Sequence, residues 1–277
     1  MNGLGNKFLI LDARCTTIHL DRQQIRKLAR SSISFDQAIT VTQANNKTNI
    51  FMQITNADGT ETSSCGNGAR CVAWLSMQET SQKAIILETR TRQFHATLGP
   101  SDKVVVVNMG QPSLKWEEIP IAKPFADTSA IDLGTKIAGL PYFPSVVSMG
   151  NPHAVFFVES LKAHDIRTIG PMLETHPMFP ERVNISLAEI SDPQKIKIVS
   201  WERGTGFTKA CGTAACAAVV SGVRTKRTNR TVEVLMRGGK LLVEWQRTTN
   251  SVITTGPVEL EFTGRINTST LAFERDN

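Results

Sequence analysis

The sequence lacks the features that mark membrane, secreted or disordered proteins. Its 277 residues contain no apolar run near the length of about 20 residues that crosses a bilayer. The N-terminal MNGLGNKFLILDAR has no basic stretch followed by an apolar segment and a small-residue cleavage site, so we do not expect a secretory signal. Disordered chains combine low hydrophobicity with high net charge, whereas this chain is 40% hydrophobic with a net charge of +6. We therefore expect a globular protein in the cytoplasm.

Aromatic residues are scarce, at 6% of the chain with a single tyrosine. Proteins that bind single-stranded nucleic acid usually stack bases on aromatic side chains beside basic groups. The sequence has a basic run with Arg224, Lys226, Arg227 and Arg230, but no aromatic residue lies among them. We interpret this run as a solvated loop, and we expect neither a nucleic-acid nor a membrane partner.

The chain has five cysteines, an odd number that does not suit a disulfide framework. Four of them fall in two similar segments, SSCGNGARCVAW around Cys65 and KACGTAACAAVV around Cys211. Each segment has an upstream partner, since Asn6 lies 59 residues before Cys65 and Asn151 lies 60 residues before Cys211. This matched spacing predicts an internal duplication, with one copy in each half of the chain.

Apolar and β-branched runs predict strands, and helices should begin at the two Cys-Gly pairs. The expected strands are 84–88, 103–108, 145–149, 154–158, 195–200, 231–236, 240–245 and 258–262. The expected helices are 21–30, 65–77 and 211–221, the last buried and stopping at Gly222. RGGK at 237–240 predicts a hairpin turn, with Gly238 and Gly239 between the two strands. The pattern predicts an α/β or α+β fold of two domains, 1–117 and 118–262, with proline-bearing stretches at the crossing.

Each Cys-Gly pair offers the chemistry of a proton-transfer site. A cysteine at a helix start meets the positive end of the helix dipole, which should lower its pKa and favour the thiolate. Free backbone N–H groups after each cysteine could hold a carboxylate, and they belong to Gly66, Asn67, Gly68, Gly212 and Thr213. Two such sites facing each other would let one thiolate remove a proton from an amino-acid α-carbon while the opposite thiol returns one.

Simpler interpretations exist for cysteines. Free cysteine is often a buried packing residue, and we give that role to Cys71 and Cys216, which point to other helix faces. Cys15 receives no role. Four cysteines could also hold structural zinc, but spacings of six and five residues do not match the usual Cys-x-x-Cys pattern. The duplication favours proton transfer for Cys65 and Cys211.

Other polar residues stand at matched offsets upstream of the cysteines. Asn56 and Glu202 each lie nine residues before their cysteine. Arg203 could grip a carboxylate with two hydrogen bonds and Glu202 could take an ammonium group, although such residues more often form a surface ion pair. His153 could assist proton transfer or could be a hydrogen-bonded core residue. The sequence leaves these alternatives open.

The sequence resembles the diaminopimelate epimerase family of cofactor-independent amino-acid epimerases. The matching segments follow the family's order over nearly the whole chain: MNGLGNKFLILD, NADGTETSSCGNGARC, MGNPHAVFFV, the Val183-Asn184 pair, WERGTGFTKACGTAACAA and TTGPVELEFTG. The resemblance implies interconversion of LL- and meso-diaminopimelate in lysine and peptidoglycan biosynthesis, without pyridoxal phosphate or a metal. It also implies two pseudosymmetric halves, each a mixed sheet or barrel wrapped around a central helix, a homodimer, and a final segment, 263–277, that packs on the first half.

The resemblance also assigns roles to residues. Cys65 and Cys211 would be the acid/base pair, polarised by His153 and Glu202, and their oxidation to a disulfide would inactivate the enzyme. The residues that would hold the reacting carboxylate are Gly66, Asn67, Gly212 and Thr213. The residues that would position the substrate are Asn6, Gln37, Asn56, Asn151, Asn184, Glu202 and Arg203. The sequence departs from the family pattern at Lys7, where Asp is common, and at Phe207, where Glu is frequent.

Two rival functions stay open. A proline or hydroxyproline racemase-like enzyme would also use paired cysteines, but it needs no second carboxylate anchor. A non-catalytic structural protein would use the cysteines for zinc. The asparagine-rich set and the Glu202-Arg203 pair favour a substrate with two amino-acid ends.

Overall fold

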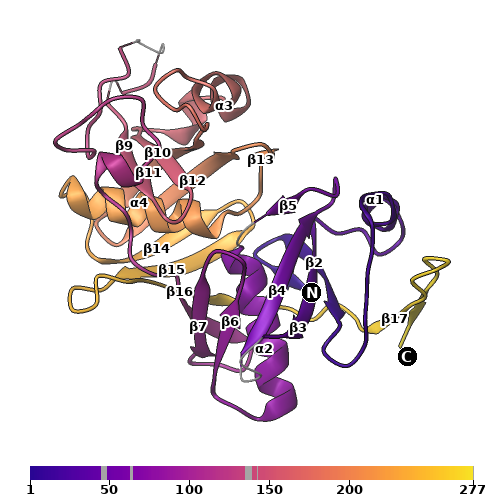
Figure 1. Cartoon of the computed structure of the whole chain (residues 1–277). Coiled ribbons are helices and arrows are strands. Elements are labelled where there is room, and N and C mark those ends of the chain that lie inside the picture. The colour runs from indigo at the N-terminus through magenta and orange to yellow at the C-terminus, as the bar shows by residue number, and fades with distance from the viewer. Residues whose placement is uncertain (45–48, 63–64, 135–138, 142, 277) are drawn as a thin grey trace. The chain divides into compact units, whose positions relative to one another are not determined.

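The computed structural model forms two compact units (Figure 1). It describes residues 1–44, 49–62, 65–134, 139–141 and 143–276. Unit 1 is Met1–Val107 with Thr255–Asn277, and unit 2 is Asn108–Thr254. The chain leaves unit 1 within strand β8 (Val104–Asn108) and returns within strand β16 (Val252–Pro257). The expected boundaries at 117/118 and 262/263 lie further along the chain than these.

Unit 1 is a mixed sheet around one buried helix. Its elements are β1 (Asn2–Gly3), β2 (Asn6–Asp12), α1 (Arg22–Ala29), β3 (Gln37–Gln43), β4 (Ile50–Asn56), β5 (Glu61–Thr62), α2 (Gly66–Thr80), β6 (Ala84–Glu88) and β7 (Gln93–Leu98). β2 pairs with β3 in parallel, β3 with β4 antiparallel, β4 with β6 in parallel, and β6 with β7 antiparallel. Helix α2 contacts β1, β2, β6 and β7, so the sheet curves around it.

Unit 2 repeats this topology. Its elements are β9 (Ser145–Ser148), β10 (Pro152–Phe157), α3 (Ile166–Glu174), β11 (Asn184–Asp192), β12 (Lys195–Glu202), β13 (Gly206–Phe207), α4 (Gly212–Arg224), β14 (Thr231–Met236) and β15 (Gly239–Trp245), with short 3-10 helices at Trp116–Glu118 and Leu161–Ala163. Parallel and antiparallel pairings follow in the same order as in unit 1. Helix α4 contacts every strand from β9 to β12, and also β14 and β15. The α+β fold of two like halves, each built around a central helix, is confirmed.

The core of each unit explains why its central helix forms there. Every residue of α4 from Gly212 to Gly222 is buried, as its small apolar sequence predicts. The core of unit 2 also includes Ile119 and Ile121, so the proline-bearing stretch at 112–124 belongs to this unit and is not a linker.

Among the described residues, no helix is long and apolar enough to cross a membrane.

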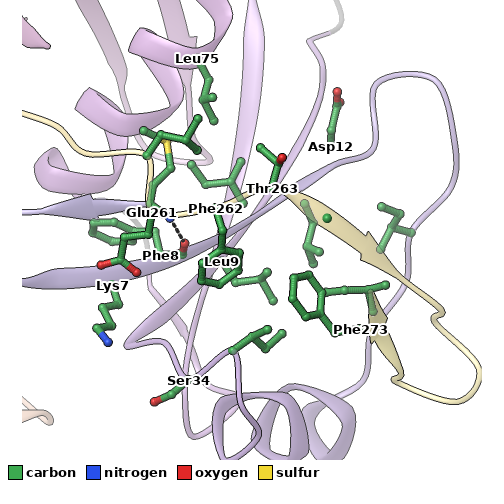
Figure 2. A pocket seen from close by; sticks show the side chains of 18 of the residues that line it. Lys7, Phe8, Leu9, Asp12, Ser34, Leu75, Glu261, Phe262, Thr263 and Phe273 are labelled. Atoms are coloured by element: carbon green, nitrogen blue, oxygen red, sulfur yellow. Dashed lines mark hydrogen bonds between the residues drawn. The ribbon is translucent and has the colours of Figure 1, made fainter. Parts of the chain in front are cut away.

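The last segment of the chain packs on the first part of unit 1. Strands β17 (Gly264–Ile266) and β18 (Phe273–Arg275) form a hairpin. The apolar residues of this tail that pack against the cluster around α1 are Phe262, Ile266, Leu271 and Phe273. A cavity of about 300 Å³ remains between β2 and the tail, and Figure 2 shows Leu9, Phe262 and Phe273 around it.

The structure corrects three details of the expected elements. The strand expected at 258–262 is wrong, because the threonine-rich segment before it forms β16 instead. Helix α4 continues past Gly222 to Arg224, and the glycine serves close packing, since a Cβ there would lie 2.5 Å from Thr228 Oγ1. The hairpin turn is made by Arg237 and Gly238, because Met236 pairs with Gly239.

We expect Gly170→Ala to destabilise unit 2. A Cβ at Gly170, within α3, would collide with the ring of Trp201, whose Nε1 donates to Glu174 at 2.6 Å. The clash should cost about 1–3 kcal/mol although alanine favours helix. Urea unfolding measures the change. Met172→Ala, at an exposed position of α3, is the control and should stay within about 0.5 kcal/mol. A gain in stability for Gly170→Ala would contradict this packing.

Candidate active site

In unit 1, three amide side chains stand at one end of three neighbouring strands. Phe8 of β2 pairs with Gln37 of β3, and Gln37 pairs with Asn56 of β4. Because β2 and β3 are parallel and β4 is antiparallel to them, the starts of β2 and β3 meet the end of β4. Asn6, the first residue of β2, shares this end of the sheet. Gln37 Nε2 donates to Asn56 Oδ1 at 2.9 Å, which fixes both amides.

Helix α2 begins with Cys65 as its N-cap, as predicted. The backbone of Cys65 is extended, and its Sγ accepts a bond from the N–H of Gly68 at 3.4 Å. The first turn packs tightly on the sheet, since a Cβ at Gly68 would lie 2.5 Å from Ile39 Cδ1. Asn67 is buried in this turn, beside β1. The glycines of CGNG therefore let the helix start approach the strands.

In unit 2, the corresponding strand ends carry a second polar group. His153 of β10 pairs with Asn184 of β11, and Ile185 pairs with Trp201 of β12, so Asn184 neighbours Glu202. Asn184 Nδ2 donates to the carbonyl of Pro152 at 2.7 Å, and Asn184 Oδ1 accepts from the N–H of Arg203 at 3.0 Å. The buried amide thus ties together the ends of three strands.

A hydrogen-bonded chain leads from strand β10 to the start of α4. His153 is fully buried, and burial, with the charge of Arg203, lowers its pKa to about 3, so the ring is neutral at physiological pH. Its Nε2 lies 3.1 Å from Asn151 Oδ1, an acceptor, so Nε2 carries the proton. Asn151 Nδ2 in turn donates to Thr213 Oγ1 at 3.4 Å. His153 therefore orients Asn151 toward the first turn of α4.

Cys211 caps α4 and lies beside Glu202. Its Sγ lies 3.4 Å from Thr213 Oγ1, and the thiol is also hydrogen-bonded to the Glu202 carboxylate, which Thr208 Oγ1 contacts as well. Burial, and then the charge of Glu202, raise the pKa of Cys211 well above its ordinary value. Burial likewise raises the pKa of Glu202. The prediction of a lowered pKa is therefore wrong for Cys211. Burial raises the pKa more than the helix N–H groups lower it, so the side chain of Cys211 is a thiol at neutral pH.

Other residues of the site differ in exposure. Arg203 is exposed, and its Nη1 donates to the carbonyl of Glu181 at 3.0 Å. The ring of Phe207 contacts two cations, with the guanidinium carbons of Arg167 and Arg237 at 4.7 and 5.2 Å from the ring centroid. These aromatic contacts involve one of the positions where the sequence departs from the family pattern.

The structure sorts the expected site residues into two groups, each assembled within one unit. The unit 1 group is Asn6, Gln37, Asn56, Cys65, Gly66 and Asn67, and the unit 2 group is Asn151, His153, Asn184, Glu202, Arg203, Cys211, Gly212 and Thr213. Cys71 and Cys216 are buried and Cys15 is exposed. Within the described ranges, no set of three or more His, Cys, Asp or Glu is placed to hold a metal ion.

Sequence reasoning missed two residues of these groups. Thr208 contacts the Glu202 carboxylate, and Arg70 donates from Nη2 to Asn67 Oδ1 at 2.8 Å. The signal for Arg70 was present, because it is the one charged residue in CGNGARCVAW, a segment predicted to be a buried helix. Thr208 gave no such signal, since an isolated threonine after a turn has many roles.

Chemically, each unit presents a thiol at a helix start beside amides that can bind a polar ligand. Each cysteine sulfur receives a backbone N–H bond, which suits a negatively charged sulfur, but burial and the neighbouring Glu202 carboxylate hold Cys211 as a thiol. One group is thus suited to accept a proton and the other to donate one.

Comparison with known proteins gives consistent results at the level of sequence and fold. The family described as diaminopimelate epimerase matches residues 1–115 and 145–261. A diaminopimelate epimerase of Rhodopseudomonas palustris (strain TIE-1) is 43% identical over 275 residues, which cover 98% of this chain and 94% of the relative.

The fold also occurs in solved structures, among them a PhzF-family protein and a hydroxyproline epimerase. A phenazine biosynthesis protein of the PhzF family from Bacillus anthracis has a TM-score of 0.64 at 16% identity, covering 92% of this chain and 91% of its own. A hydroxyproline epimerase from Agrobacterium vitis, solved with bound trans-4-hydroxy-L-proline, has a TM-score of 0.59 at 13% identity. The match covers 85% of this chain and 77% of that structure's chain. At these identities the likeness concerns the fold alone.

Glu202→Gln should lower the pKa of Cys211. The negative charge of Glu202 opposes formation of the thiolate, so removing it favours the thiolate. Cys211 should then react with iodoacetamide at lower pH than in the unchanged protein, as measured by peptide-resolved mass spectrometry over a pH series. Glu189→Gln is a matched control, because Glu189 bonds Lys197 and the N–H of Leu161. An unchanged Cys211 profile in Glu202→Gln would mean that burial alone sets this pKa.

Proposed function

This chain belongs to the diaminopimelate epimerase family, and from that premise we propose that it interconverts LL- and meso-2,6-diaminopimelate. The observation that carries the proposal is the repeated placement of a cysteine. Cys65 and Cys211 each cap the central helix of one unit, at the same place in the same topology. Inversion of a carbon centre needs one proton carrier for each face, and two like sites supply them.

The proposed reaction moves one proton at an α-carbon. In one direction the Cys65 thiolate takes the α-proton: the C–H bond breaks, an S–H bond forms, and the electron pair stays on carbon and spreads into the carboxylate. The Cys211 thiol then gives its proton to the opposite face, and its sulfur is left as a thiolate. In the reverse direction the two cysteines exchange roles. Glu202 lies against the Cys211 sulfur and supports its protonated form between turnovers.

Backbone and amide groups would hold the substrate. We assign the reacting carboxylate to the N–H groups at the helix starts, because they are suited to the charge that builds up as the proton leaves. They belong to Gly66, Asn67, Gly212 and Thr213. We assign the rest of the substrate, including its second amino-acid end, to Asn6, Gln37, Asn56, Asn151, Asn184, Glu202 and Arg203. The bonded pairs Gln37–Asn56 and Asn184–Arg203 support this, since they hold their polar groups in fixed orientations.

Cys65→Ala and Cys211→Ala should each reduce inversion of LL-diaminopimelate by at least about 10³-fold, because each removes one of two proton carriers. Chiral chromatography of substrate and product, with EDTA present and no pyridoxal phosphate, measures the rate. Cys15→Ala, at an exposed cysteine outside both groups, should keep full activity. Turnover of proline by the unchanged protein, without turnover of diaminopimelate, would refute the proposed substrate.

We also propose that the enzyme works as a homodimer, and that a second copy covers the apolar cavity between β2 and the tail. Leu260 at this cavity is 36% exposed, and the cavity lining is largely aliphatic and aromatic (Figure 2). Large open apolar surfaces commonly mark interfaces.

Leu260→Asp should therefore give monomers in analytical ultracentrifugation at concentrations where the unchanged protein is dimeric. Leu242→Asp, 45% exposed on β15 of unit 2, is the matched control and should remain dimeric. Dissociation by Leu242→Asp alone would place the interface on unit 2, and a monomeric unchanged protein would refute the dimer.

A further inference from the structure

Helix α2 contains a fully buried arginine. Arg70 is 0% exposed, and its neighbours Ala69, Cys71, Val72 and Ala73 are small or apolar and also buried. Arginine is almost never fully buried without partners, and its guanidinium stays charged at any physiological pH. A buried positive charge in this helix is costly to the fold unless polar groups bind it.

The guanidinium of Arg70 determines how Asn67 is oriented. Arg70 Nη2 donates to Asn67 Oδ1 at 2.8 Å, three residues back along the helix. Arginine can only donate, so the amide oxygen of Asn67 must face Arg70. The amide Nδ2 of Asn67, a donor of two hydrogens, therefore faces away from Arg70. Asn67 itself is only 2% exposed, so its packing holds this orientation.

The positive charge lies beside the start of the helix. Side chains in a helix lean toward its N-terminus, and residues three apart share a face. The bond to Asn67 shows that the guanidinium reaches the first turn, next to the Cys65 cap. There its charge adds to the positive end of the helix dipole. An anion held by the first-turn N–H groups of α2 would be attracted by both.

The second copy of the motif lacks this arrangement. Cys216 stands five residues after Cys211, as Arg70 stands five residues after Cys65, and it is buried and uncharged. Thr213 stands in the place of Asn67, and its hydroxyl contacts Asn151 and Cys211. The charge beside the cysteine in unit 2 is the carboxylate of Glu202, and the positive charge of Arg203 acts on His153. Of the two helix starts, the start of α2 is thus the more favourable for an anion.

We propose that Arg70 is a positioning residue that orients Asn67 and places a buried positive charge behind the carboxylate-binding turn of α2. This proposal rests on the proposed function, because the anion is the α-carboxylate of the reacting end of diaminopimelate. Arg70 acts through Asn67 and through its charge, and it is not itself in contact with the substrate. Its role is to make the α2 turn the stronger anchor of the carboxylate.

Kinetics of four variants test the coupling of the two residues. Arg70→Met should raise KM for LL-diaminopimelate at least about tenfold and change kcat less than about threefold, because uniform substrate binding is lost. Asn67→Ala should give a similar KM. The KM of the double variant should exceed that of Asn67→Ala by no more than about twofold, since the two residues act together. Arg70→Lys keeps the charge and a donor, and should recover KM to within about threefold of the unchanged enzyme.

A second measurement separates this proposal from the proposed function and from a folding defect. The side-chain amide of Asn67 gives an NMR signal that Asn67→Asp removes, and in Arg70→Met this signal should shift and exchange faster with solvent. An unchanged signal, or KM effects of Arg70→Met and Asn67→Ala that multiply in the double variant, would overturn the positioning role. Loss of thermal stability with unchanged KM would mean a structural role only. If the unchanged protein does not turn over diaminopimelate, the proposed function fails, and the amide signal alone decides the orientation of Asn67.

Discussion

The free backbone N–H groups at the starts of two buried helices are the constraint on which the rest of the structure depends. The first N–H groups of a helix have no partner within it, and each buried donor left unsatisfied costs about 1–3 kcal/mol. In α2 the Cys65 sulfur accepts one of them, from Gly68. In α4 the N–H of the equivalent residue, Ala214, faces the Cys211 sulfur and favours its charged form. These buried helix starts are therefore most stable when an anion accepts hydrogen bonds from their N–H groups. A site for a carboxylate needs this property.

The sheets place polar groups where the helices start. In each unit a parallel strand pair and an antiparallel neighbour bring two strand starts and one strand end together. The same framework then carries different chemistry in each copy. Phe8 corresponds to His153, Asn56 to Glu202, Asn67 to Thr213 and Arg70 to Cys216. The group of the first copy contains amides and a cation, and the group of the second contains a neutral imidazole, a hydroxyl and a carboxylate. Such unlike surroundings suit two thiols with opposite tasks.

Local sequence patterns predicted the helix starts but not the electrostatics of the cysteines. Cys65 and Cys211 could be placed as N-caps because glycine and small residues follow them in an apolar run. The strands β2, β3 and β4 were missed, since their mixed polar and apolar residues give no clean alternation, although they carry Asn6, Gln37 and Asn56. The raised pKa of Cys211 could not be predicted, because it depends on burial and on Glu202, which approaches only through the fold. The contact of Phe207 with Arg167 and Arg237 likewise joins residues far apart in the sequence.

The proposed reaction requires that two cysteines with different surroundings act on opposite faces of one carbon. The position of solvent deuterium during the first few per cent of reaction tests it most directly. LL-diaminopimelate is incubated with the reduced protein in heavy water. The residual substrate and the product are then separated, and the deuterium content of each is measured by mass spectrometry. Two-base inversion predicts one deuterium in the meso product and none in the remaining LL substrate. Deuterium entering the remaining substrate as fast as the product would mean that a single base serves both faces, and it would contradict the account.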